Sequence, residues 1–246
     1  MICSETSLAL VAGAYRAPGE HGVSRASCCD DFEMIDVVNE EQDVPYGEDW
    51  HAAAEVAAWI EAADRKRPWR AQIREYIAEH ISTLRVGARV LELGSGPGFL
   101  AECILQRCSE LACYTLLDFS APMLAISRER LASFQVASFA LASFKSADWP
   151  EKVAGPFDCV VSMQAVHELR NKRHAPQLYR EIYQVTTATG QALICDHLPF
   201  DDSPKSVALY MTAEEQFRAL SSAGFRRIRT ALAVNGLMLY ACEKAG

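Results

Sequence analysis

From residue 88 onward, short apolar runs of six or seven residues alternate with longer segments of mixed polarity. Runs of this length without polar alternation are typical of strands buried on both faces of a sheet. Strands are predicted at 88–93, 112–117, 136–142, 157–162 and 190–196, with helices between them near 98–108, 121–132 and 173–187. Regular alternation of strands and helices predicts right-handed crossovers and a parallel sheet.

The end of the chain has a different pattern. A helix is predicted from Thr212, where Thr and Glu three residues apart form a capping box, to Ala223. Two strands follow at 226–233 and 236–243, and the Asn-Gly pair at their junction favours a tight hairpin. The chain is therefore predicted to be an α/β protein, with a doubly wound, mostly parallel seven-stranded sheet, an antiparallel last strand and helices on both faces.

Two helices are predicted before the first strand, at 50–64 and from Pro68 to about residue 81. Apolar residues recur on one side of each, at Val56, Trp59, Ile60 and Ala63 in the first and at Trp69, Ile73, Tyr76, Ile77 and Ile81 in the second. Such faces require a partner, so both helices are expected to pack on the sheet domain. We expect a flexible acidic extension at 1–49 and one domain at 50–246, with an N-terminal helical extension at 50–86 and a Rossmann-like core at 87–246.

The net charge of −8 is concentrated in one segment. Residues 30–49 contain nine acidic residues and no Lys or Arg, so the rest of the chain is close to neutral. A nucleic-acid partner is not expected, because the excess of basic residues that binds phosphates is missing. The Cys and His spacings form no zinc-binding pattern, and no apolar run approaches the roughly 18 residues that span a membrane. We expect a cytoplasmic protein with free thiols, no metal site and no membrane partner.

The most informative motif lies at the end of the first predicted strand. Residues 90–100 read VLELGSGPGFL, an apolar strand that ends in a glycine-rich turn and opens into a helix. Gly94 and Gly96 permit a tight turn and a close approach to a ligand, and the helix N-terminus presents free N–H groups. A dinucleotide-binding G-x-G-x-x-G motif needs a third glycine where this chain has Phe99, which disfavours a nicotinamide-dependent oxidoreductase.

Because Glu92, Gly94, Gly96 and Gly98 follow the pattern ExGxGxG, residues 50–246 resemble the class I S-adenosylmethionine-dependent methyltransferases. The resemblance implies S-adenosylmethionine as the cofactor, no metal, and transfer of a methyl group to an O, N or C atom of a small molecule. The residues then expected to bind the cofactor are Glu92, Gly94, Ser95, Gly96, Gly98, Asp118, Phe119, Met123, Ser143, Phe144, Met163 and Gln164.

Asp118 follows the second predicted strand, where the family holds the ribose hydroxyls of the cofactor with an acid. A carboxylate at this point can also cap the next helix. After the third strand the family often has an acid and an aromatic residue for the adenine, and Ser143 and Phe144 occupy that register here. Asp148 is an alternative acid for the same role. Met123 is expected either at the adenine edge or in the core.

The fourth strand leads into the segment MQAVHEL at 163–169, at the strand ends where doubly wound sheets bind ligands. This segment is similar to that of plant-type small-molecule O-methyltransferases, which implies a catalytic-base role for His167. A histidine with a pKa near neutrality can accept a hydroxyl proton, although the same residue can instead cap the next helix. Asp196 and His197 follow the fifth strand and are secondary candidates for contact with the acceptor.

Two further functions remain open. One is a non-catalytic S-adenosylmethionine-binding module that serves as a scaffold or sensor. The other is a protein methyltransferase, to whose acidic substrate groove the acids at 30–49 would contribute. In the enzyme, the N-terminal helices and residues 46–50 are expected to close over the cofactor as a lid.

Overall fold

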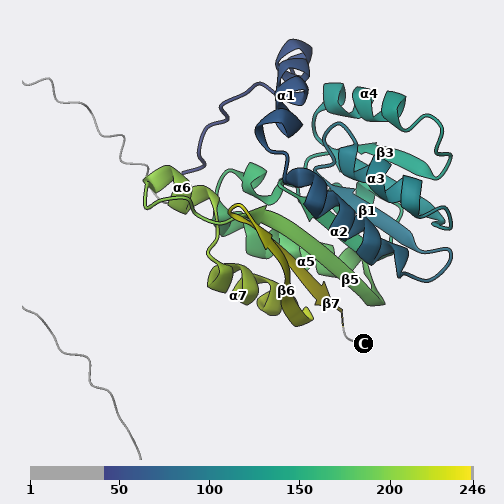
Figure 1. Cartoon of the computed structure of the whole chain (residues 1–246). Coiled ribbons are helices and arrows are strands. Elements are labelled where there is room, and N and C mark those ends of the chain that lie inside the picture. The colour runs from purple at the N-terminus through teal and green to yellow at the C-terminus, as the bar shows by residue number, and fades with distance from the viewer. Residues whose placement is uncertain (1–41, 245–246) are drawn as a thin grey trace, which may run out of the picture. The chain divides into compact units, whose positions relative to one another are not determined.

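The computed structural model describes residues 42–244. Its seven strands form one sheet in the order β3-β2-β1-β4-β5-β7-β6 (Figure 1). They are β1 (Arg89–Leu93), β2 (Cys113–Asp118), β3 (Ala137–Leu141), β4 (Phe157–Met163), β5 (Thr186–His197), β6 (Arg226–Val234) and β7 (Leu237–Glu243). Strand β7 runs antiparallel to both β5 and β6, and all other neighbours are parallel. The predicted doubly wound sheet with an antiparallel last strand is confirmed.

Helices cover both faces of this sheet (Figure 1). The α-helices are α1 (Ala53–Lys66), α2 (Arg70–Ser82), α3 (Phe99–Arg107), α4 (Ala121–Arg130), α5 (Ala175–Val185), α6 (Pro204–Leu209) and α7 (Ala213–Ala223). Short 3₁₀ helices are η1 (Trp149–Lys152), η2 (Val166–Leu169) and η3 (Lys172–His174). Val90 and Leu91, neighbours in β1, point into different cores, the first with α2, α3 and α4 and the second with α5 and α7.

Two elements begin three or more residues before or after their predicted starts, and one helix was not predicted. Helix α1 begins at Ala53 rather than at Trp50, because the chain first turns where Asp49 Oδ1 accepts the N–H of His51 at 2.9 Å. Strand β5 begins at Thr186, within the range predicted as helix, because two β-branched threonines follow Val185 and favour the strand. Helix α6 was not predicted at all. Residues 1–41, which include most of the predicted acidic extension, lie outside the described part.

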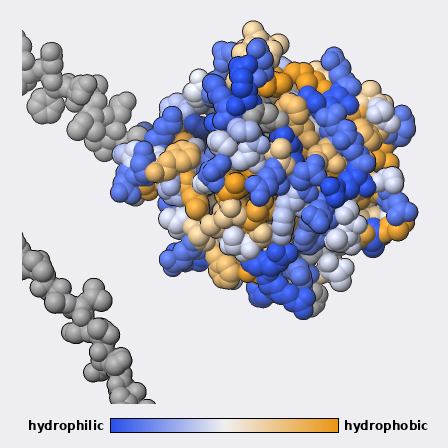
Figure 2. All heavy atoms as spheres, viewed as in Figure 1, coloured by the Kyte–Doolittle hydropathy of each residue, from blue (hydrophilic) through white to orange (hydrophobic). Residues whose placement is uncertain are grey.

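The surface of the described part is a mixture of hydrophilic and apolar residues. Figure 2 shows hydrophilic and apolar residues interspersed over the viewed face. Apolar atoms contribute to the surface of every globular protein, so scattered apolar residues require no special explanation. Within residues 42–244, no helix combines the length and the apolar character that crossing a membrane requires.

The turn after β1 joins three strands at the carboxyl edge of the sheet. Gly94, Gly96 and Gly98 have φ angles of 66°, 54° and 81°, which only glycine adopts freely. A Cβ placed on Gly94 would lie 2.3 Å from the Cβ of Ala165, which follows β4. The backbone N–H groups of Gly94 and Ser95 both donate to the carbonyl of Leu117 in β2, at 2.8 and 3.1 Å. The turn therefore has no room for a side chain at its first position.

Substitution of Gly94 by alanine is expected to destabilise the protein more than the same change at Gly236. Both glycines have positive φ angles, 66° and 75°, so each substitution incurs about 1–2 kcal/mol of backbone strain. Only Gly94→Ala adds a clash with Ala165, because a Cβ on Gly236 meets no atom within 4 Å. Overpacking adds about 1–3 kcal/mol to the loss. Urea unfolding of both variants measures the difference, and equal losses would contradict this packing.

Candidate active site

Two adjoining cavities of about 80 and 90 Å³ lie at the carboxyl ends of β1, β2 and β4. Both are lined by Trp59, Gly94, Gly96 and Gln164. The first is also lined by Trp50, Asp118, Phe119, Ser120, Met123, Phe144, Ala165 and Glu168, and the second by Arg70, Arg74, Glu92, Ser95, Pro97, Phe99, Leu100 and Met163. All residues predicted to bind the cofactor, except Gly98 and Ser143, thus line one of these two cavities.

Asp118 ends β2 and lies at the floor of the first cavity. Its Oδ2 accepts the N–H of Gly96 at 2.8 Å, and its Oδ1 accepts the N–H of Ser120 at 2.8 Å. Burial raises the pKa of Asp118, and the hydrogen bonds from these N–H groups oppose that rise. Ser120, not Asp118, caps α4 through its hydroxyl, which accepts the N–H of Met123. The backbone N–H of Phe119 adds a further hydrogen bond to this carboxylate, and the residue lines the first cavity.

The second cavity brings a buried acid and basic side chains together. Burial raises the pKa of Glu92 to about 8, although the Tyr114 hydroxyl donates to its Oε2 at 2.8 Å and stabilises the charge. Ser95 Oγ is buried and has no hydrogen-bond partner among the described residues. Arg70 and Arg74 line the opposite side. This cavity thus offers an acid, a free hydroxyl and two cations to a zwitterionic group.

The two candidates for holding an adenine amino group both lie outside these cavities. Ser143 Oγ accepts the N–H of Lys145 at 3.2 Å, and the exposed Asp148 pairs with Lys152 at 3.2 Å. Phe144 and Met123, in contrast, are buried and line the first cavity. Met123 both lines the first cavity and is buried in the core, so the expected positions at a ligand and in the core do not exclude each other.

His167 forms a buried ion pair at the edge of the site. Its Nδ1 lies 2.7 Å from Asp196 Oδ1, its backbone N–H donates to Asp196 Oδ2 at 2.8 Å, and its Nε2 lies 3.4 Å from Glu168 Oε1. Burial lowers the pKa of His167, but the charges and hydrogen bonds of Asp196 and Glu168 outweigh it and raise the pKa to about 10. Asp196, predicted only as a secondary contact, is thus the partner that orients the imidazole.

Gln164 connects the N-terminal helices to the end of β5. Its Oε1 accepts the Nε–H of Arg70 at 2.5 Å, and its Nε2 lies 2.9 Å from His197 Nε2. Its backbone has a φ of 56°, which is uncommon for a residue with a side chain and often marks a functional position. The backbone N–H of Gln164 donates to Cys195 O at 2.7 Å and fixes this conformation.

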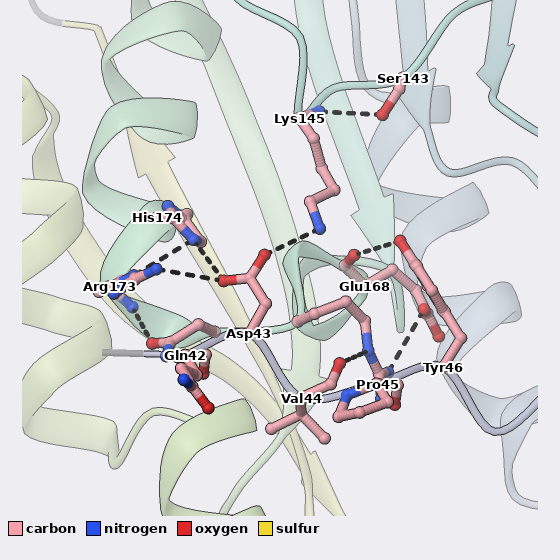
Figure 3. A network of polar contacts seen from close by, with 12 residues as sticks. Gln42, Asp43, Val44, Pro45, Tyr46, Ser143, Lys145, Glu168, Arg173 and His174 are labelled. Atoms are coloured by element: carbon pink, nitrogen blue, oxygen red, sulfur yellow. Dashed lines mark hydrogen bonds and ion pairs between the residues drawn. The ribbon is translucent and has the colours of Figure 1, made fainter. Parts of the chain in front are cut away.

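Residues 42–50, which we call the N-terminal strap, run across the loops that follow β3 and β4 (Figure 3). Asp43 pairs with Lys145 at 3.1 Å, His174 at 2.8 Å and Arg173 at 3.4 Å. The buried Arg170 donates to the carbonyls of Val44 at 3.0 Å and Pro45 at 2.6 Å. These contacts clamp the first half of the strap.

The second half of the strap reaches the cofactor cavities. The Tyr46 hydroxyl donates to Glu168 O at 3.1 Å, and its ring lies under the Arg170 guanidinium at 4.9 Å (Figure 3). Trp50 O accepts the Ser120 hydroxyl at 2.5 Å, and its ring meets Trp59 edge-on at 5.6 Å. Trp50 belongs to the segment 46–50 that was expected to cover the cofactor, whereas Trp59 was assigned to packing because it lies on the apolar face of α1.

Comparison with known proteins agrees with this geometry. Residues 90–190 match the family model described as a methyltransferase domain. The chain is 30% identical over 122 residues to the ubiquinone/menaquinone biosynthesis C-methyltransferase UbiE of Pseudomonas savastanoi pv. phaseolicola, which covers 48% of this chain and 45% of that protein. The chain therefore spans less than half the length of the curated relatives that it matches.

Solved structures share the fold at low identity. Human N-acetylserotonin methyltransferase in complex with SAM superposes with a TM-score of 0.62 at 17% identity, over 80% of this chain and 58% of that one. A putative O-methyltransferase from Nostoc punctiforme gives a TM-score of 0.61 at 17% identity, over 76% of this chain and 60% of that one. Residues 90–190 thus resemble a methyltransferase domain in sequence, and the described part of the chain shares the fold of these solved structures.

Replacement of Asp196 by asparagine is expected to lower the free energy of unfolding by about 3 kcal/mol near neutral pH, because it leaves the buried His167 cation with only the more distant Glu168 carboxylate, 3.4 Å away. The pKa of His167 is raised from 6.5 to about 10, so the pair contributes fully below pH 6.5 and loses its contribution as the pH rises to 10. The difference in the free energy of unfolding between the unmodified protein and Asp196→Asn, measured by urea unfolding, should become smaller from pH 6.5 to pH 10. We call this difference the gap. A gap that does not change with pH would contradict the ion pair.

Replacement of Asp43 by asparagine is expected to speed dissociation of S-adenosylhomocysteine about 2–10-fold, because the strap that carries Trp50 loses its clamp. Asp148→Asn is the matched control, since Asp148 also pairs with a lysine but lies outside the cavities. Stopped-flow displacement measures both rates. If Asp43→Asn leaves the rate as unchanged as the control does, the strap does not cover the ligand.

Proposed function

We propose that this protein transfers a methyl group from S-adenosylmethionine to an O, N or C atom of a small molecule. The observation that carries the proposal is the pairing of Asp118 with the glycine turn. Both oxygens of this buried carboxylate accept backbone N–H groups, and the residue lines the first cavity. A carboxylate fixed in this way is suited to bind the two ribose hydroxyls of an adenosyl ligand as charge-assisted hydrogen bonds.

The remaining residues fit the other parts of the cofactor. Phe119, Met123 and Phe144 would enclose the adenine ring with apolar surface. At the other end, Glu92 would accept from the ammonium group of the methionyl part, and Ser95 Oγ would find the partner that it lacks in the described structure. Backbone atoms can approach the ligand at Gly96, where a Cβ would meet open space.

When bound, S-adenosylmethionine supplies a methyl group on a sulfonium that is already activated. The protein therefore contributes orientation and exclusion of water rather than activation. Trp50 and Trp59 would exclude water, since both come from the N-terminal part and lie over the cavities. The two cavities are small beside the roughly 300–1,000 Å³ of typical ligand sites, so we propose that the strap and α1 act as a lid that opens for entry.

For His167 we propose the role of proton acceptor. Asp196 occupies Nδ1, so Nε2 is the nitrogen that would take a proton from the acceptor. Because the pKa of His167 is raised to about 10, the neutral ring becomes more abundant as the pH rises above neutrality. This pair at the edge of the cavities favours an enzyme over a non-catalytic binding module.

The proposed partner is a small molecule rather than a nucleic acid, because only two basic residues, Arg70 and Arg74, line the two cavities. A cytoplasmic location is proposed on the cysteines. Cys108, Cys159, Cys195 and Cys242 are buried free thiols in the described part, and reducing compartments preserve such thiols.

The decisive experiment is calorimetry of the intact protein with S-adenosylhomocysteine. We expect binding, and a loss of affinity of about 10–100-fold in Asp118→Asn, because one charge-assisted hydrogen bond is worth about 1.5–3 kcal/mol. 5′-Methylthioadenosine, which keeps the ribose, should lose a similar factor. Asp148→Asn should bind both ligands as the unmodified protein does. Absence of binding by the unmodified protein would refute the proposed function.

A further inference from the structure

The Glu168 carboxylate lies between two basic side chains, and Glu168 also lines the first cavity. Its Oε1 is 3.4 Å from His167 Nε2, and its Oε2 is 3.5 Å from Arg170 Nη1. Both distances exceed the roughly 2.7–2.9 Å of a charge-assisted hydrogen bond. Among the described residues, Oε2 is buried and has no hydrogen-bond partner. The carboxylate is therefore attracted by both basic groups and forms a close contact with neither.

The guanidinium of Arg170 is fixed in place by the N-terminal strap. Its Nε and Nη2 donate to the carbonyls of Val44 and Pro45, and its backbone carbonyl accepts the N–H of Val44 at 2.8 Å. The Tyr46 ring covers it, and the Tyr46 hydroxyl donates to the backbone carbonyl of Glu168 (Figure 3). The remaining nitrogen, Nη1, faces the Glu168 carboxylate. A planar guanidinium held at two of its nitrogens attracts this carboxylate from a fixed direction.

The surroundings of His167 leave Glu168 as the group at its second nitrogen. Asp196 Oδ1 lies 2.7 Å from Nδ1, and the rings of His197 and Tyr210 lie 5.6 and 5.5 Å from the imidazole. Burial lowers the pKa of His197 to about 4, so this ring is neutral near pH 7. The titratable and charged groups around the imidazole are Asp196 and His197 of β5, Glu168 of η2, Arg170 at the end of η2, Tyr210 after α6 and Lys172 of η3.

We propose that Arg170 is a positioning residue that draws the Glu168 carboxylate away from His167 Nε2 and keeps this nitrogen available to a proton from the methyl acceptor. Without Arg170, Glu168 would close on Nε2 and form a second ion pair, like the one that Asp196 forms at Nδ1. Both ring nitrogens would then be occupied. This inference rests on the proposed function, because that function gives His167 the role of proton acceptor.

The same arrangement makes two carboxylates compatible in one cavity. Glu168 and Asp118 both line the first cavity, and the charge of Glu168 adds to the rise in the pKa of Asp118 that burial causes. Like charges in one site disfavour each other's ionised forms. Arg170 offsets the charge of Glu168 from the side of the strap, so Asp118 can remain ionised for the ribose.

The test is an NMR titration of the His167 Cε1–H signal from pH 6 to pH 11 in the full chain without ligand. We expect Arg170→Gln to raise the pKa of His167 by about one unit, because Glu168 then pairs with the imidazolium alone. Glu168→Gln should lower the pKa by about one unit. In the double variant, the pKa should match that of Glu168→Gln, because Arg170 acts on His167 through Glu168.

Arg173→Gln is the matched control. Arg173 also contacts the strap, through Asp43 at 3.4 Å, but its guanidinium does not pair with Glu168. This variant should leave the pKa of His167 unchanged. In Arg170→Lys, the pKa should lie between those of the unmodified protein and Arg170→Gln, because an ammonium keeps the charge but cannot serve both strap carbonyls and Glu168 in the geometry of a guanidinium.

An unchanged pKa of His167 in Arg170→Gln would limit Arg170 to holding the strap and overturn the inference. A rise that persists in the double variant would also overturn it, because Glu168 would not be the intermediary. If Arg170→Gln does not fold, Arg170→Lys decides, and a pKa no higher than that of the unmodified protein refutes the inference. The titration requires no ligand, so its outcome is independent of the calorimetry that tests the proposed function.

Discussion

The site depends on one interaction, the grip of the Asp118 carboxylate on the glycine turn that follows β1. Its two oxygens accept the N–H groups of Gly96 and Ser120, so the ends of β1 and β2 cannot move independently. Gly94 brings the end of β4 into the same unit, because it packs against Ala165 without space for a side chain. The cost of burying this charge is offset by backbone N–H groups that would otherwise lack partners at the start of a helix. The same residue lines the first cavity.

Other titratable groups at this edge of the sheet are buried with hydrogen-bonded partners. Glu92 is held by the Tyr114 hydroxyl, and His167 is held by Asp196. Each pair costs desolvation energy, so the edge is less stable than an apolar one of the same shape. Parallel strands concentrate such costs at their carboxyl ends, where the loops diverge and ligands replace water. The order of the strands thus decides where polar chemistry is possible, and the individual side chains decide which chemistry it is.

The fold could be predicted because strand and helix periods are local properties. The capping box at Thr212 and the Asn-Gly hairpin have the structures that their residues indicate. Contacts in the site between residues far apart in the sequence could not be predicted. Trp59 has the same apolar spacing as its core neighbours, and no local rule shows that Asp196 orients His167. Phe144 lies in its expected place, but its neighbour Ser143 forms a turn contact with Lys145 instead of lining the cavity.

Two further parts of the chain resisted prediction, the junction of the N-terminal helices and the segment after β5. Arg67 lies between two helices, and Phe200 and Tyr210 lie on either side of a six-residue helix that no periodicity indicates. Neither segment contributes to the parallel sheet, although the helices on either side of Arg67 contribute Trp59, Arg70 and Arg74 to the lining of the two cavities. Gln164 joins them to the sheet, because its backbone is fixed by β5 while its amide is oriented by Arg70 and His197. Segments at the ends of strands tolerate changes in sequence more readily than the strands themselves, so this edge of the sheet is where the specificity of such a fold can change.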